Sequence, residues 1–137
     1  MAALTTERPT KRRGDHNKSS ILAVPVKANT KIFKGSLVVA DAGYAAPGRT
    51  ATTLKVIGRA RATVDNTGGA AGAKTIEVER GVFKWQNSAA GDQIAQADFL
   101  GTCYIVDDQT VAKTDGTGTR SVAGTIVGID SDGVWVE

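Results

Sequence analysis

Turn signals built from glycine, proline and aspartate recur along this chain at intervals of about eight to twelve residues, which leaves room for short strands only. The clearest signals lie at residues 41–43, 47–48, 65–72 and 130–133. Residues 92–100 are the one segment with a helical pattern, and they suffice for one or two turns. The sequence therefore predicts an all-β fold: a small single-domain β-barrel or sandwich of about eight to ten short strands with an extended N-terminal arm.

Ile76 and Val78 alternate with glutamates in the longest stretch of strand chemistry. Such alternation is typical of a strand with one buried and one solvated face. The large apolar residues that follow, Phe83 and Trp85, have odd numbers, so a straight strand would place them on the opposite face. One extra residue at residues 80–81 would restore a common face, and the sequence therefore predicts a β-bulge there and a strong bend in the strand.

The aromatic side chains are spread along the chain and stand mostly at positions where a strand would face the core. We expect Phe83, Trp85, Tyr104 and Trp135 to form part of the structural core. One of the two tryptophans is also a candidate for a contact between subunits. If Trp85 is fully buried, its replacement by alanine should cost about 3 to 5 kcal/mol of stability.

The chain has a single cysteine, Cys103, and a single histidine, His16. One cysteine forms neither an internal disulfide nor a multi-cysteine metal site, and one histidine supplies no multi-histidine metal site. The apolar neighbours of Cys103 favour a buried, inert thiol over a nucleophile. No catalytic residue, metal ligand or cofactor-binding residue is predicted, and we expect a protein that is not an enzyme.

Charge is distributed unevenly along the chain. Residues 21–137 hold twelve basic and twelve acidic side chains, so the net charge of +3 comes from residues 1–20. This N-terminal segment contains almost no large apolar side chain, and it is expected to be a flexible basic arm on a neutral body formed by residues 21–137. Its basic residues are Arg8, Lys11, Arg12, Arg13 and Lys18.

The basic cluster of the arm has three interpretations from sequence: a contact with nucleic acid, a segment that docks on an acidic protein surface, or a solvated tail. No apolar run approaches the roughly 20 residues that span a bilayer, and the N-terminus lacks the apolar centre of a signal peptide. We therefore expect no membrane partner and a cytosol-like compartment.

The order of the elements over most of residues 21–137 resembles the small capsid decoration, or cement, proteins of tailed bacteriophages. No single motif in this likeness is catalytic; it is a likeness of pattern. The segments that carry it are Leu-Ala-Val-Pro-Val, Lys-Ile-Phe-Lys-Gly-Ser-Leu-Val, Ile-Gly-Arg-Ala, Val-Asp-Asn-Thr-Gly-Gly-Ala-Ala-Gly, Val-Glu-Arg-Gly-Val-Phe-Lys-Trp, Cys-Tyr-Ile-Val-Asp-Asp-Gln-Thr-Val-Ala and Val-Ala-Gly-Thr-Ile-Val-Gly-Ile-Asp.

The resemblance implies a structural viral protein that binds the outer surface of a bacteriophage head and stabilises it by bridging neighbouring major capsid protein subunits. It implies a virion location on the outer capsid surface, after a period in the host cytoplasm during assembly. The implied partners are the major capsid protein and the protein itself, with a homotrimer expected first and a dimer second. The resemblance assigns no functional residues; the capsid-binding role of the arm is a hypothesis from its charge and composition.

Two other function classes compete with this one. A nucleic-acid-binding β-barrel using the basic arm is the main alternative, but the even charge balance of residues 21–137 argues against it, so nucleic acid is not an expected partner. A small hydrolase or carbohydrate-binding domain would need a concave site with convergent carboxylates or exposed aromatics, which the composition does not favour.

Overall fold

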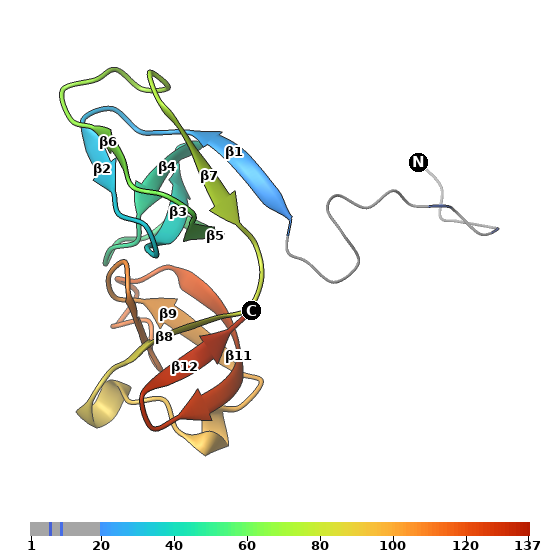
Figure 1. Ribbon diagram of the computed structural model, residues 1–137. Helices are drawn as coiled ribbons and strands as arrows, with labels where there is room; N and C mark the ends of the chain where they lie inside the picture. The colour runs from blue at the N-terminus through green and yellow to red at the C-terminus, as the bar shows by residue number, and fades with distance from the viewer. Residues whose placement is uncertain (1–5, 7–8, 10–19) are drawn as a thin grey trace.

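The chain forms two lobes that are joined once, at residues 80–82, as the ribbon shows (Figure 1). The computed structural model describes residue 6, residue 9 and residues 20–137. We call residues 20–80 the first lobe and residues 81–137 the barrel. Strands are the main regular secondary structure of both lobes, which confirms the predicted all-β fold.

The first lobe is a five-stranded sheet in the order β1-β7-β5-β3-β4, with a two-stranded sheet of β2 and β6 beside it. A parallel bridge between Val26 and Ala45 brings the chain just after β1 against β4, so that the large sheet nearly closes on itself. The strands are β1 (Ile21–Pro25), β2 (Thr30–Ile32), β3 (Leu37–Asp41), β4 (Tyr44–Pro47), β5 (Lys55–Ala60), β6 (Val64–Asn66) and β7 (Thr75–Glu79).

The barrel is closed, with the strand order β10-β8-β12-β11-β9. Residues 92–100, where one or two helical turns were expected, carry the end of one 3₁₀ turn and the whole of a second. The elements are β8 (Phe83–Asn87), η1 (Ala90–Asp92), η2 (Gln96–Asp98), β9 (Thr102–Ile105), β10 (Thr110–Ala112), β11 (Val122–Asp130) and β12 (Gly133–Val136).

The described residues contain twelve strands, more than the eight to ten expected. One addition is β4, which begins between the turn signals at residues 41–43 and 47–48. The other is β8, which is separate from β7. Short pairings such as β4 with β3 depend on a two-residue hairpin loop, Ala42 and Gly43, more than on strand composition.

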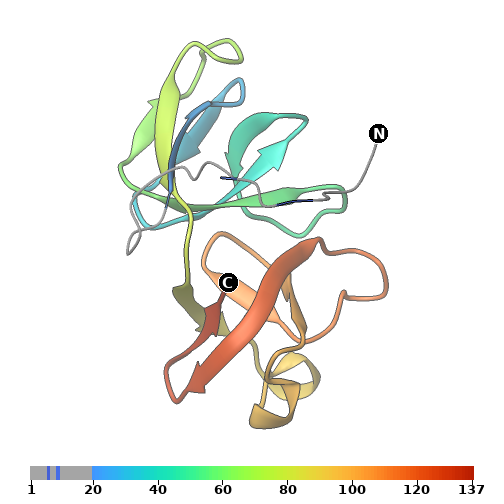
Figure 2. The same ribbon diagram turned by 90° about the vertical axis from the view of Figure 1, so that its right-hand side faces the viewer.

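The predicted β-bulge at residues 80–81 is wrong. β7 pairs with β1 and β5 in the first lobe, whereas β8 pairs with β10 and β12 in the barrel. The change of phase between Val78 and Phe83 therefore marks the passage of the chain from one sheet to another, which Figure 2 shows as a single connector. β7 and β8 each face the core of their own lobe, so Val78 and Phe83 do not need to lie on the same face of one sheet.

Two hydrophobic cores fill the lobes, and the larger one crosses the boundary between them. Leu37 and Leu54 of the first lobe pack with Trp85 and Ile105 of the barrel in one buried cluster. Main-chain contacts follow the same boundary: the Leu37 amide donates to the carbonyl oxygen of Asp108 at 2.8 Å. The shared core fixes the two lobes against each other and so shapes the surface between them.

Candidate interaction surface

A groove runs along the boundary between the two lobes. It consists of two adjoining hollows of about 360 and 340 Å³, both of which Gly35 and Arg59 line. We call it the inter-lobe groove. Its other lining residues are Lys34, Ala60, Arg61 and Glu79 from the first lobe and Val82, Phe83, Lys84, Trp85 and Trp135 from the barrel.

Strand alternation explains why these side chains reach the groove. Arg59 is exposed on β5 between two buried residues, Gly58 and Ala60. Trp135 likewise lies on β12 between two buried valines, so its indole points outward. The same register that buries the core thus presents a guanidinium from one lobe and an indole from the other.

Three of the four cations that line the groove are held by carboxylates of their own lobe, and the fourth, Lys34, forms no ion pair with a described residue. Arg59 pairs with Glu79 at 3.1 Å, and Arg61 pairs with Glu77 at 2.7 Å. Lys84 lies 2.9 Å from Asp132, and the hydrogen bond that it donates lowers the pKa of that carboxyl group. The charges of Arg59, Arg61 and Lys84 are therefore balanced within the protein.

Aromatic rings and cations stack along the groove. The Arg59 guanidinium lies 4.5 Å from the centre of the Phe83 ring, and Lys84 Nζ lies 5.5 Å from that of Trp135. Phe83 also meets Trp85 edge to face, with ring centres 6.3 Å apart. Trp135 Nε1 donates to an Asp130 carboxylate oxygen at 2.8 Å. These contacts fix the orientation of the exposed rings before any partner arrives.

The four predicted core aromatics have different environments. Trp85 is buried at 8% exposure, and the half-buried Phe83 packs against the same cluster. Tyr104 is half-buried on β9. The core assignment of Trp135 is wrong, because this side chain is 37% exposed. Val134 and Val136 take the two inward positions of β12, which leaves Trp135 on the solvent face and makes it the better candidate for a contact with a partner.

The basic residues predicted to bind the capsid lie outside the described residues. They are Arg8, Lys11, Arg12, Arg13 and Lys18. The described part of the body begins at Ser20, whose carbonyl oxygen accepts a hydrogen bond from the Arg80 amide at 2.8 Å. The arm thus joins the body beside the connector, one residue from Glu79 of the inter-lobe groove. It leads into β1, an edge strand of its sheet.

Cys103 is fully buried on β9, as predicted. Burial raises the pKa of its thiol to about 12, and Sγ donates a hydrogen bond to the Gly124 carbonyl oxygen at 3.6 Å. A thiol with so high a pKa is a poor nucleophile at neutral pH. Within residues 20–137, no three histidine, cysteine, aspartate or glutamate side chains are grouped so that they could hold a metal ion.

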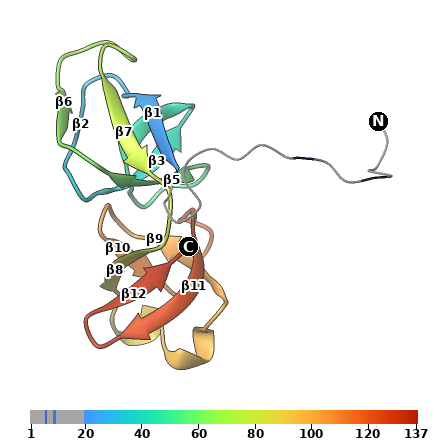
Figure 3. The ribbon, with the colours of Figure 1, turned by 45° about the vertical axis from the view of Figure 1, so that its right-hand side comes forward.

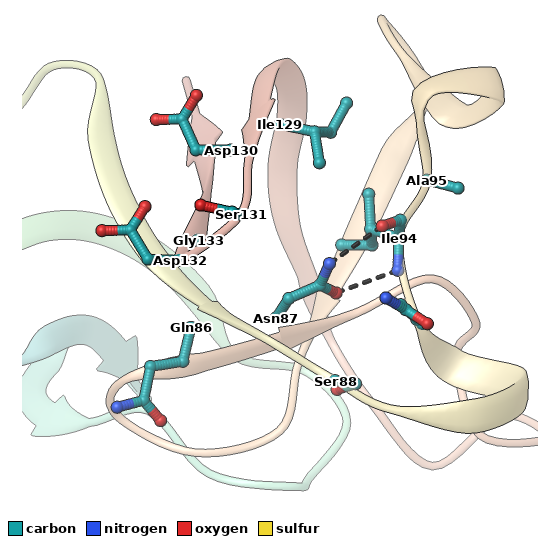
Figure 4. Close-up of a pocket in the computed structure, with 11 residues that line it drawn as sticks. Gln86, Asn87, Ser88, Ile94, Ala95, Ile129, Asp130, Ser131, Asp132 and Gly133 are labelled. Atoms are coloured by element: carbon teal, nitrogen blue, oxygen red, sulfur yellow. Dashed lines mark hydrogen bonds between the residues drawn. The ribbon is translucent and has the colours of Figure 1, made fainter.

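A third hollow, of about 700 Å³, opens at the β11–β12 turn (Figure 4). Four of the polar side chains that line it form hydrogen bonds within the fold. The Asn87 side chain donates to the Ile94 carbonyl and accepts from the Ile94 amide, and Ser88 donates to the Val111 carbonyl. Asp130 and Asp132 accept from Trp135 and Lys84. The hollow lacks a nucleophile paired with a base, so we treat it as a structural feature.

No helix in the described part of the chain is long and apolar enough to cross a membrane. In comparisons with protein-family models, with curated proteins and with solved structures, nothing matches this chain. The inter-lobe groove and the charges around it are thus the observations from which a function has to be argued.

Proposed function

We propose that the protein is a structural viral protein that binds the outer surface of a bacteriophage head and bridges neighbouring major capsid protein subunits. The oligomer we favour is a homotrimer. The observation that carries this proposal is the inter-lobe groove, in which the exposed Trp135 and the half-buried Phe83 lie beside the ion-paired Arg59. The resemblance to decoration proteins supplies the identity of the partner.

The groove has the composition of a protein-binding surface. Tryptophan and arginine are enriched among the residues that dominate protein–protein binding energy, and a polar rim excludes water around them. Here Trp135 and Val82 are exposed apolar groups in the groove, and Arg59 with its partner Glu79 forms part of the rim. A loop of a capsid subunit with a complementary apolar side chain is the expected occupant.

The arm supplies a second contact that starts next to the first. Because Ser20 bonds to Arg80, the basic residues 8–18 are tethered to a point beside the groove. A segment that orders only on binding covers a large surface at modest affinity. Linking two weak contacts in one chain, and several chains in one oligomer, raises the overall affinity without any new contact.

A nucleic-acid-binding module is the second candidate, because the groove combines cations with aromatic rings, as single-strand binding surfaces do. The carboxylates argue against it. Glu77, Glu79 and Asp132 lie within 3.1 Å of three of the groove's four cations and would repel phosphates. A phosphate backbone needs cations whose charge is free to neutralise it.

The test measures how many copies of the protein bind to purified empty heads, which we call the occupancy. Trp135→Ala should lower occupancy about tenfold or more, as expected for a central aromatic contact. Tyr44→Ala is the matched control, because Tyr44 has the same 37% exposure and does not line the groove. A deletion of residues 2–18 tests the arm separately. Equal occupancy of the two aromatic variants and of the wild type would refute the groove as the capsid contact.

The same heads should be compared with single- and double-stranded DNA. Binding to heads without binding to DNA supports the capsid role. Binding to DNA that weakens steeply with salt, together with no binding to heads, would establish the nucleic-acid alternative instead.

A further inference from the structure

The two lobes carry opposite charge. Residues 20–80 hold nine basic and four acidic side chains, a surplus of five positive charges. Residues 81–137 hold three basic and eight acidic side chains, a surplus of five negative charges. The twelve basic and twelve acidic side chains of the body are therefore divided unequally between the two lobes. The lobes are stacked end to end (Figure 3). The described body is strongly polarised.

These opposite charges do not neutralise each other within one molecule. Among the described residues, every ion pair joins two residues of the same lobe: Lys27 and Arg49 with Asp41, Arg59 with Glu79, Arg61 with Glu77, Lys84 with Asp130 and Asp132, Lys113 with Asp98, and Arg120 with Asp92. No ion pair of this set crosses the boundary, although the lobes share a core.

The surplus charges lie at the surface. In the first lobe, five exposed cations form no ion pair with any described residue: Lys31, Lys34, Lys55, Lys74 and Arg80. In the barrel, Asp115 and Glu137 are exposed acidic side chains that form no ion pair with a described residue. Both signs are therefore available to a partner.

We propose that the first lobe of one copy of this chain docks against the acidic barrel of a second copy. Salt screens charges beyond about 8 Å at physiological ionic strength, so the attraction requires direct contact with a surface of opposite sign. A second copy presents both surfaces, with surpluses of equal size. A contact between two different surfaces is heterologous, the kind from which rotationally symmetric rings are built.

This contact is independent of the capsid. The charges changed to test it, such as those of Lys55 and Asp115, lie outside the inter-lobe groove, and the contact can be measured in solution without heads. A wild-type chain that binds heads but does not associate with itself in solution would therefore count against this proposal alone. Loss of capsid binding by Trp135→Ala, with self-association intact, would not affect it.

The first experiment is sedimentation equilibrium of the full chain at low and high salt. Self-association should weaken about tenfold or more between about 0.05 and 0.5 M NaCl, because the contact is electrostatic. Lys55→Glu and Lys113→Glu form a matched pair, since each lowers the net charge by two. The first reduces the positive surplus of the first lobe and should weaken association; the second increases the negative surplus of the barrel and should not.

The second experiment mixes two variants with complementary changes. Lys55→Glu/Arg80→Glu weakens the basic surface, and Asp115→Lys/Glu137→Lys weakens the acidic one. Each alone should associate poorly, whereas the mixture should form one-to-one complexes through the intact barrel of the first and the intact first lobe of the second. A wild type that stays monomeric, association unaffected by salt, equal weakening by Lys55→Glu and Lys113→Glu, or no complex in the mixture would overturn the proposal.

Discussion

The guanidinium of Arg59 on β5 lies 4.5 Å from the ring centre of Phe83 on β8, and this contact joins the two lobes across the groove. A double-mutant cycle with Arg59→Ala and Phe83→Leu should give a coupling energy of about 0.5 to 1 kcal/mol in urea unfolding, as for other cation–π pairs near the surface. Arg61→Ala is the control, because Arg61 pairs with Glu77 but contacts no ring. A coupling to Phe83 as large for Arg61 as for Arg59 would contradict this assignment.

The two tryptophans should respond to truncation in opposite ways. Trp85 is buried in the shared core, so Trp85→Ala should lower the free energy of unfolding by about 3 to 5 kcal/mol. Trp135 is 37% exposed, and Trp135→Ala should cost less than about 1 kcal/mol in the same urea titration. A large loss for Trp135→Ala would mean that its bond to Asp130 holds the β11–β12 hairpin together.

The sequence predicted the fold class and many of the strand positions from local patterns. The prediction failed where two different strand arrangements produce the same pattern of apolar residues. Between Val78 and Phe83, a bulge within one strand and a passage between two sheets both shift the side chains by one position. Only the partners of β7 and β8, which come from distant parts of the chain, distinguish them.

The candidate site was less predictable for a related reason. On the short strand β12, Trp135 lies between two valines, so all three side chains are apolar. The sequence therefore does not show which of them face the core, and Trp135 was assigned to the wrong face. The opposite charges of the two lobes can be counted in the sequence, but the net charge of residues 21–137 is zero and does not reveal them. It becomes evident once the lobe boundary at residues 80–82 is known.

Acid should weaken the first lobe through Asp41. The hydrogen bond from Lys27, at 2.7 Å, and that from Arg49 lower the pKa of this carboxyl group below its ordinary value. A lowered folded-state pKa stabilises the fold above the unfolded-state value of about 3.9, and this contribution is lost as the pH falls through the folded-state pKa. Asp41→Asn should therefore be less stable at pH 7, with a smaller loss of stability in acid.

Urea unfolding at a series of pH values measures this difference. The curves of the wild type and of Asp41→Asn should converge as the pH drops below about 4. The stability of Lys27→Gln should depend on pH less than that of the wild type but more than that of Asp41→Asn, because Arg49 remains 2.9 Å from the Asp41 carboxylate. Parallel curves for wild type and Asp41→Asn would show that this cluster makes no pH-dependent contribution.

Cys103 should react with thiol reagents only when the barrel opens. It has no exposed surface, and its pKa of about 12 leaves little thiolate at pH 8. We expect labelling by a disulfide reagent to be slow in buffer and complete in denaturant, with a rate set by opening of the native state. Cys103→Ala/Val122→Cys is the comparison, because residue 122 on the paired strand β11 is 52% exposed and should be labelled at once. Rapid labelling of native wild type would contradict the closed barrel.

Gly58 should be the least replaceable residue of β5. A β-carbon at this position would lie 2.1 Å from the carbonyl oxygen of Glu79 on β7, so Gly58→Ala must push the two strands apart. The expected loss of unfolding free energy is at least about 2 kcal/mol, measured by urea titration. Capsid binding should fall as well, because the neighbouring Arg59 and Glu79 line the inter-lobe groove. Gly91→Ala, where no heavy atom lies within 4 Å of the added carbon, should change stability by less than about 0.5 kcal/mol. Similar losses in the two variants would show that β5 and β7 are not in close contact at this point.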